Sequence, residues 1–116
     1  MRGLGIDITP IERIAGLDRA YPERFRSKVL APGEVARTAE SLAGLWAAKE
    51  AVSKALGTGF REFGPRDICI GHDAHGAPTV TLMGRAAQVA CERGITHVKV
   101  SISHAGGMAV ACAAAL

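Results

Sequence analysis

A long helical pattern near the middle of the chain constrains the fold more than any other feature. It runs from about Thr38 to Leu56 without a proline, and its alanines favour a helix at little cost in side-chain entropy. Gly57 and Gly59 follow at once, as expected of a helix end and the loop after it. Apolar side chains recur on one face of this helix: Leu42, Leu45, Trp46, Val52, Ala55 and Leu56. A chain of 116 residues has room for one core, so we expect a single domain over residues 1–116.

Shorter elements surround the central helix. Residues 2–8 alternate as a half-buried strand does, with Leu4, Ile6 and Ile8 on one face and Asp7 beside two glycines on the other. The rest of the sequence predicts two short helices over residues 11–20 and 23–30, and a hairpin of strands 67–71 and 78–82. A further helix over 84–93 and a second hairpin of strands 98–103 and 108–114 follow. The order β-α-α-α-β-β-α-β-β, with two antiparallel hairpins, predicts an α+β fold rather than a doubly wound parallel sheet.

Composition bears on the core and on the partners. Aromatic residues make up only 4% of the chain, so the core must be built largely from Ala, Val, Leu and Ile. These side chains bury little area each, which makes a monomer of this size marginal and favours an oligomer. The net charge of +3 suits an acidic partner or a phosphate-rich small molecule. Because the basic residues form no run and do not alternate with aromatic residues, we do not expect nucleic-acid binding.

Nothing in the sequence is typical of a secreted or membrane protein. The N-terminal residues lack the apolar stretch of a signal peptide, and no run approaches the roughly 18 apolar residues of a membrane helix. Cys69, Cys91 and Cys112 are widely spaced, which favours small buried residues in a reducing compartment over disulfides or a zinc site. We therefore expect a cytoplasmic protein without membrane contact.

The charged residues of the central helix are the first candidates for chemistry. Glu50 and Lys54 share one helix face at a spacing of four, with Ser53 beside them and Gly57 one turn beyond. Taken alone, such a pair is usually a solvated ion pair on a surface helix. Here alanines flank the charges and glycines follow them, so a ligand can approach the backbone N–H groups while the ammonium group faces a phosphate. This setting favours a phosphate-binding site.

Asp7 supplies a second carboxylate, from the N-terminal strand. A lone aspartate on a strand is more often a turn or cap residue, and the glycine spacing before it does not match the dinucleotide-binding fingerprint. Together with Glu50, however, two carboxylates, water and a pyrophosphate would fill the octahedral oxygen shell that Mg²⁺ prefers. Such a metal neutralises phosphate charge and lowers the pKa of an oxygen that it binds.

These motifs together resemble the bacterial holo-[acyl-carrier-protein] synthases of the 4′-phosphopantetheinyl transferase superfamily. Each motif would be a weak signal by itself, but their order and spacing agree over nearly the whole chain. The matching stretches are Gly3–Ile8, Ile11–Ile14, Arg24-Phe25, Val29-Leu30 with Glu34, Leu42–Gly59, Asp67-Ile68, Gly76–Pro78 and Val100–His104.

The resemblance implies a 4′-phosphopantetheinyl transferase-like fold, with an antiparallel sheet packed on the long central helix. It also implies an enzyme that moves 4′-phosphopantetheine from coenzyme A to a serine of an apo acyl carrier protein and releases adenosine 3′,5′-bisphosphate. Asp7 and Glu50 would hold Mg²⁺ against the coenzyme A pyrophosphate, and Lys54 would contact the phosphate that leaves. The base that deprotonates the serine would be either Glu50 or a metal-bound water, and the sequence leaves both open.

Further contacts follow from the same resemblance. The residues that would line the coenzyme A pocket are Lys49, Ser53, Lys54, Gly57 and Gly59, and His104 would lie near the nucleotide end. Arg13 and Arg24 would dock the acidic helix of the carrier protein. The family implies a homotrimer with its sites between subunits. Two questions stay open: whether the carrier serves fatty-acid, polyketide or peptide synthesis, and whether acylated coenzyme A is accepted.

The sequence departs from the family at Leu45. Family members usually have arginine there, in a Gly-Arg-Phe context that reads Gly44-Leu45-Trp46 in this chain. A phosphate or adenine contact of coenzyme A is therefore missing or supplied by another residue. The alternative function is a non-catalytic module with the same fold that binds a carrier protein or coenzyme A. A further polar group, His72, Asp73 and His75, is interpreted as an ordinary turn.

Overall fold

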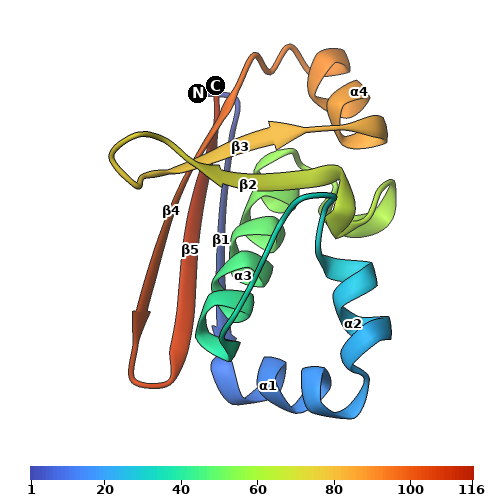
Figure 1. The fold of residues 1–116 in the computed structure, drawn as a ribbon. Helices are drawn as coiled ribbons and strands as arrows, with labels where there is room; N and C mark the ends of the chain where they lie inside the picture. The colour runs from blue at the N-terminus through green and yellow to red at the C-terminus, as the bar shows by residue number, and fades with distance from the viewer.

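The computed structural model describes all residues from 1 to 116 and has the predicted α+β architecture (Figure 1). The main sheet is antiparallel and contains, in spatial order, β1 (Gly3–Pro10), β5 (Met108–Ala115) and β4 (Val98–Ala105). A separate antiparallel hairpin contains β2 (Ile68–His72) and β3 (Pro78–Leu82). Because β1 pairs with β5, the two ends of the chain lie side by side (Figure 1).

Four α-helices accompany the strands: α1 (Ile11–Ala20), α2 (Pro22–Val29), α3 (Ala39–Ala55) and α4 (Gly84–Glu92). Two short 3₁₀ turns, Gly59–Arg61 and Pro65–Asp67, connect α3 to β2. The start of α3 is capped by Thr38, whose hydroxyl oxygen accepts a hydrogen bond from the Ser41 N–H at 3.0 Å. The helix thus begins and ends close to where the sequence pattern predicted.

Helix α3 lies between the two sheets. In Figure 1 it runs in front of the main sheet, and β2 and β3 pass across its C-terminal part. Leu42, Ala47, Ala48, Ala51 and Val52 have no exposed surface. A helix covered on several sides has no broad solvent-facing stripe, so α3 forms the centre of the core rather than one wall of it.

Strand β1 packs on α3 with its backbone. A Cβ atom added at Gly3 would lie 1.9 Å from the Ala55 carbonyl oxygen, and one added at Gly5 would lie 1.9 Å from the Ala51 carbonyl oxygen. Only glycine allows so close an approach of strand and helix. Asp7 follows on the same face of the strand, so this packing directs its carboxylate toward α3.

The apolar residues of β1 lie on its other face, which points away from α3. Leu4, Ile6 and Ile8 are 62%, 63% and 62% exposed. The sequence predicted a half-buried strand, and within the chain the buried half is the glycine face. The strand register continues the apolar face onto β5, where Cys112 lies opposite Ile6 and Val110 opposite Ile8. We call these five residues the outer sheet face.

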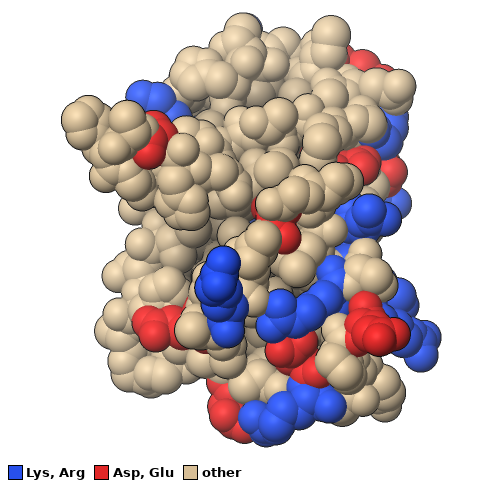
Figure 2. All heavy atoms as spheres, in the orientation of Figure 1, with Lys and Arg blue, Asp and Glu red and all other residues tan.

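Charged side chains gather over one end of the molecule. Figure 2 shows basic and acidic groups mixed over the lower right of the view, where α1 and α2 lie in Figure 1. None of the helices has the length and apolar character needed to cross a membrane. The three cysteines are free. Cys91 and Cys112 are exposed, so the prediction that the cysteines are small buried residues is wrong for these two.

Candidate active site

Two carboxylates from distant parts of the sequence meet beside α3. Asp7 comes from the glycine face of β1, and its side chain is only 15% exposed. Glu50 comes from α3 and is half-buried. Burial raises the pKa of the Glu50 carboxyl above its usual range, and the negative charge of Asp7 raises it further. The fold thus holds two like charges close together, which is unfavourable unless a cation shares them.

Lys54 and Thr9 contact the two oxygens of the Asp7 carboxylate. Lys54 Nζ lies 3.3 Å from Asp7 Oδ1 and donates a hydrogen bond to the Ile6 carbonyl oxygen at 2.9 Å. The Thr9 hydroxyl donates to Asp7 Oδ2 at 2.6 Å. The charges of Lys54 and of Arg13 on α1 lower the pKa of Glu50, against the effects of burial and Asp7. The structure therefore brings the three predicted catalytic residues, Asp7, Glu50 and Lys54, into one cluster.

This pair of carboxylates fits a magnesium ion. Both groups offer hard oxygen ligands, and Mg²⁺ in phosphate-handling enzymes is usually held by one or two carboxylates plus water and substrate phosphates. A site built in this way needs no third protein ligand. The chain has no group of three or more His, Cys, Asp and Glu side chains, which would suit a metal caged by protein alone. Asp7 and Glu50 are therefore the residues that would hold the ion.

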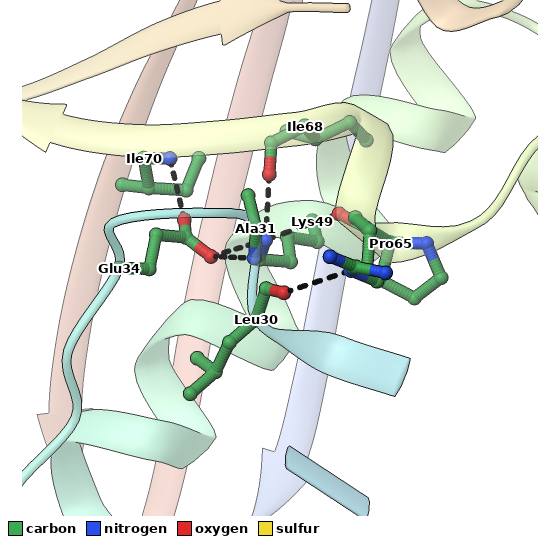
Figure 3. Close-up of polar contacts among 8 residues, drawn as sticks. Leu30, Ala31, Glu34, Lys49, Pro65, Ile68 and Ile70 are labelled. Atoms are coloured by element: carbon green, nitrogen blue, oxygen red, sulfur yellow. Dashed lines mark hydrogen bonds and ion pairs between the residues drawn. The ribbon is translucent and has the colours of Figure 1, made fainter. Parts of the chain in front are cut away.

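Lys49 lies in the core and not in this cluster. Its side chain has no exposed surface, and Figure 3 shows its ammonium group facing Glu34 and the carbonyl groups of Pro65 and Ile68. The three Nζ distances are 2.7, 3.0 and 2.6 Å. An ammonium group has three protons, so all of them are used within the protein. The predicted contact of Lys49 with coenzyme A does not agree with this placement, and we assign Lys49 a structural role.

Ser53 is also buried, with no exposed surface, and its hydroxyl donates to the Glu50 carbonyl oxygen at 2.7 Å. That bond lies within the helix, so Ser53 has no free surface toward a ligand. Its predicted place in the coenzyme A pocket is not supported by this geometry. Neighbours on a helix point about 100° apart, which explains how Glu50 and Lys54 reach the site while Lys49 and Ser53 do not.

The predicted glycines follow α3. Gly57 and Gly59 have positive φ angles of 89° and 58°. Gly57 borders a polar pocket of about 270 Å³ beside Thr58, Arg61 and Arg93. Arg93 donates to the Leu56 carbonyl oxygen at 2.8 Å, and a Cβ atom at Gly57 would collide with its guanidinium group. Gly57 therefore lies at the end of α3, beside a pocket lined by two cations and by the Glu62 carboxylate.

His104 and Leu45 lie elsewhere, in a pocket of about 230 Å³ that also includes Gly44 and His72. His104 Nε2 lies 3.1 Å from the Glu40 carbonyl oxygen. His104 belongs to β4 and Asp7 to β1, which are the opposite edges of the main sheet. Within one chain the residue predicted near the nucleotide end and Asp7 therefore lie on strands that β5 separates.

The remaining polar residues are placed as follows. Asp73 Oδ1 accepts hydrogen bonds from the N–H groups of His75 and Ala77 at 2.8 and 3.0 Å, which supports the interpretation of this segment as a turn. Arg24 lies on α2 beside a groove of about 320 Å³ that Tyr21, Phe25 and Lys28 also line.

The sequence analysis did not identify Thr9 as a partner of Asp7, nor Glu34 as the partner of Lys49. Thr9 could have been found from its place two residues after Asp7, because alternate strand residues share a face. Glu34 carries no such signal, since its contact with Lys49 joins a loop to a helix.

Comparison with known proteins places the chain in a family. Residues 3–113 match the model of the 4′-phosphopantetheinyl transferase superfamily. A holo-[acyl-carrier-protein] synthase of Halothermothrix orenii is 41% identical over 96% of this chain and 94% of its own length. The corresponding synthase of Nitratidesulfovibrio vulgaris is 44% identical over 94% of this chain and 93% of its own length.

Solved structures agree with this assignment. The holo-[acyl-carrier-protein] synthase of Neisseria meningitidis superposes with a TM-score of 0.92 at 33% identity, over 100% of this chain and 98% of that one. The Helicobacter pylori synthase in complex with coenzyme A superposes with a TM-score of 0.88 at 33% identity, over 97% of this chain and 99% of that one. The chain therefore belongs to the 4′-phosphopantetheinyl transferase superfamily. Within it, the chain groups with the holo-[acyl-carrier-protein] synthases, which confirms the resemblance found in the sequence.

Proposed function

We propose that this protein transfers 4′-phosphopantetheine from coenzyme A to a serine of an apo acyl carrier protein, leaving adenosine 3′,5′-bisphosphate. The observation that carries the proposal is the meeting of Asp7, Glu50 and Lys54 in a chain that matches holo-[acyl-carrier-protein] synthases over nearly its full length. The coenzyme A complex of the Helicobacter pylori relative supports coenzyme A as the donor.

Asp7 and Glu50 would hold a Mg²⁺ ion, which supplies positive charge against the pyrophosphate of coenzyme A. Lys54 is 48% exposed, so its ammonium group can turn from Asp7 to the phosphate that leaves and stabilise the charge that develops there. Glu50 lies half-buried beside Asp7, where either its carboxylate or a metal-bound water would accept the serine proton. The serine oxygen then attacks the phosphorus atom, and the bond to the leaving phosphate breaks.

The acidic carrier protein would dock on α1 and α2. Arg13 lies close enough to influence Glu50, and Arg24 borders the groove with Tyr21, Phe25 and Lys28. Cations around an aromatic floor suit a helix with acidic and apolar residues. Docking there would bring the carrier serine toward the carboxylates from the Arg13 side.

A homotrimer would complete the site. The outer sheet face is an exposed apolar patch, and such patches mark interfaces between proteins. Because His104 and Asp7 lie at opposite edges of the sheet, one coenzyme A molecule could contact the carboxylates of one chain and His104 of a second. The cytoplasmic location expected from the sequence stays a prediction.

One observation favours the second candidate, a non-catalytic binding module. The pocket that contains Leu45 and His104 has no lysine or arginine to hold a phosphate. If this pocket takes the nucleotide end of coenzyme A, the loss of the family's arginine weakens that contact.

The test is the intact mass of an apo acyl carrier protein after incubation with this protein, coenzyme A and Mg²⁺. We expect a gain of one phosphopantetheine group, lost when the metal is chelated and absent with a Glu50→Gln variant. No gain on fatty-acid and polyketide carriers alike would contradict the transferase. Calorimetric binding of carrier without binding of coenzyme A would then favour the module.

A further inference from the structure

Thr9 is a buried polar residue next to the catalytic carboxylates that the proposed chemistry does not use. It lies on the glycine face of β1, two residues after Asp7, and is 2% exposed. Its hydroxyl makes one hydrogen bond, to Asp7 Oδ2 at 2.6 Å. A hydroxyl with no other partner in a buried place is a donor committed to that carboxylate.

The backbone holds this donor in place. Thr9 pairs with Ala109 in the β1–β5 ladder, one pair before its end, and a β-branched side chain on a strand has few accessible rotamers. The O–H···O distance is in the range of charge-assisted hydrogen bonds, which are stronger than neutral ones. The contact therefore restricts rotation of the Asp7 carboxylate about its terminal bond.

The two carboxylate oxygens then have different roles. Oδ2 is occupied by Thr9, while Oδ1 lies on the side of Lys54, at 3.3 Å from Nζ. A carboxylate free to rotate would present either oxygen to a cation and would lose conformational freedom when it binds. One held by a neighbouring donor is already oriented.

We propose that Thr9 is a positioning residue of the metal site: its hydroxyl orients the Asp7 carboxylate so that Oδ1 is presented to a divalent cation. This inference rests on the proposed role of Asp7 and Glu50 as metal ligands. Hydrogen-bond partners of ligating residues tune metal affinity, and their removal typically weakens binding by about 10- to 100-fold. The hydroxyl of Thr9 acts through Asp7 and does not touch the substrate.

The direct test measures Mn²⁺ binding to the protein without coenzyme A or carrier. The electron paramagnetic resonance signal of the free ion reports how much Mn²⁺ stays unbound. Thr9→Val keeps the shape and removes the donor, so we expect Mn²⁺ affinity to fall by about 10- to 100-fold. Thr9→Ser keeps the donor and should recover most of the affinity. Thr81→Val makes the same change on β3, which belongs to the other sheet, and should bind Mn²⁺ as the parent does.

Steady-state kinetics provide a second readout. For Thr9→Val the Mg²⁺ concentration that gives half-maximal rate should rise, while kcat at saturating Mg²⁺ stays near that of the parent. A merely structural threonine would lower stability without moving the metal dependence. A folded Thr9→Val variant with the Mn²⁺ affinity of the parent overturns the proposal.

A second pair of variants covers the case in which valine unfolds the chain. Cysteine at position 9 is close to serine in size but donates only a weak hydrogen bond, so Thr9→Cys should bind Mn²⁺ more weakly than Thr9→Ser. Equal affinities of the two would overturn the proposal. If the parent itself binds no Mn²⁺, the metal site and this inference fail together, whereas unchanged affinity in Thr9→Val removes the inference and leaves the metal site standing.

Discussion

Lys49 and Glu50 are neighbours in the sequence with opposite environments. The Lys49 ammonium is sealed in the core against Glu34, and burial lowers its pKa although the Glu34 carboxylate acts in the other direction. Glu34 is fully used as well, because Oε1 accepts from the Ala31 N–H and Oε2 from the Ile70 N–H, both at 2.7 Å. Glu50 is half-buried, and its carboxylate lies near the like charge of Asp7. One residue anchors the helix, and we propose that the next binds a cation.

Replacing Glu50 with glutamine should separate activity from stability. Transfer activity should be lost, while the metal-free fold should gain about 0.5–2 kcal/mol at neutral pH, as expected when an unfavourable charge is removed. The raised pKa fixes the sign: between the ordinary Glu pKa and the raised one, the folded parent binds more protons than the unfolded chain, so its stability falls as pH rises through that window.

Urea unfolding with a chelator present, followed from acid to neutral pH, measures this difference. Parent and Glu50→Gln should have similar stability below the ordinary Glu pKa and should diverge above it. If the stability difference between parent and Glu50→Gln were the same at every pH, it would not arise from the charge on Glu50.

The buried ion pair of Lys49 and Glu34 predicts a larger change in stability. Lys49→Met leaves the Glu34 carboxylate buried without its cation and two carbonyl oxygens without a donor, so stability should fall by about 3–5 kcal/mol. Lys28→Met removes an exposed lysine and should change it by about 0.5 kcal/mol or less. Urea midpoints at constant m-value compare the two, and equal effects would show that Lys49 is not an anchor.

At the scale of elements, the contact of β1 with α3 forms the site. The strand approaches the helix because Gly3 and Gly5 have no side chains, and this approach brings Asp7 to Glu50. The helix in turn is held from its other side by the Lys49 contacts to the loop after α2 and to β2 (Figure 3). Strand, helix and hairpin therefore set the distance between the two carboxylates together.

Gly5→Ala should disturb this contact. The added methyl group would lie 1.9 Å from the Ala51 carbonyl oxygen, and overpacking of this kind costs about 1–3 kcal/mol or more. Turnover should fall as well, because β1 must move away from α3. Gly16→Ala on α1 meets its nearest atom at 3.9 Å and should gain about 0.5–1 kcal/mol. Thermal unfolding and transfer rates test both, and normal activity in a folded Gly5→Ala variant would contradict the argument.

Elements defined by local pattern could be predicted from the sequence. The span of α3, the two hairpins and the face shared by Glu50 and Lys54 follow from periodicity and from the glycines after them. The pairing of β1 with β5 could not, because no local signal joins opposite ends of a chain. The burial of Lys49 could not either, since a single sequence does not say which of two adjacent charged residues faces the core.

At the scale of the whole molecule, the outer sheet face is the feature that one chain leaves unexplained. It carries three large exposed aliphatic side chains on β1 and extends over Val110 and Cys112 of β5. The neighbouring strand β4 presents Lys99, Ser101 and Ser103, so the apolar patch has a polar border. An apolar centre with a polar rim is the arrangement expected of an interface.

Ile6→Lys should prevent assembly. We expect the parent to sediment with three times the 12.0 kDa mass of one chain and the variant to sediment as a monomer with native circular dichroism. Val35→Lys is the matched control, because Val35 is 70% exposed and lies outside the outer sheet face. A trimer that survives Ile6→Lys would place the interface on another surface.

The alternation along β1 has a consequence for how the strand tolerates change. At positions 3 and 5 the backbone touches α3, so every side chain other than hydrogen should impair folding of the single chain. At positions 4, 6 and 8 the chain itself imposes little restriction, and only association with further copies would select apolar residues. A saturation mutagenesis scan read once for abundance and once for activity should therefore alternate along the strand: positions 3 and 5 should report on folding, and positions 4, 6 and 8 on assembly.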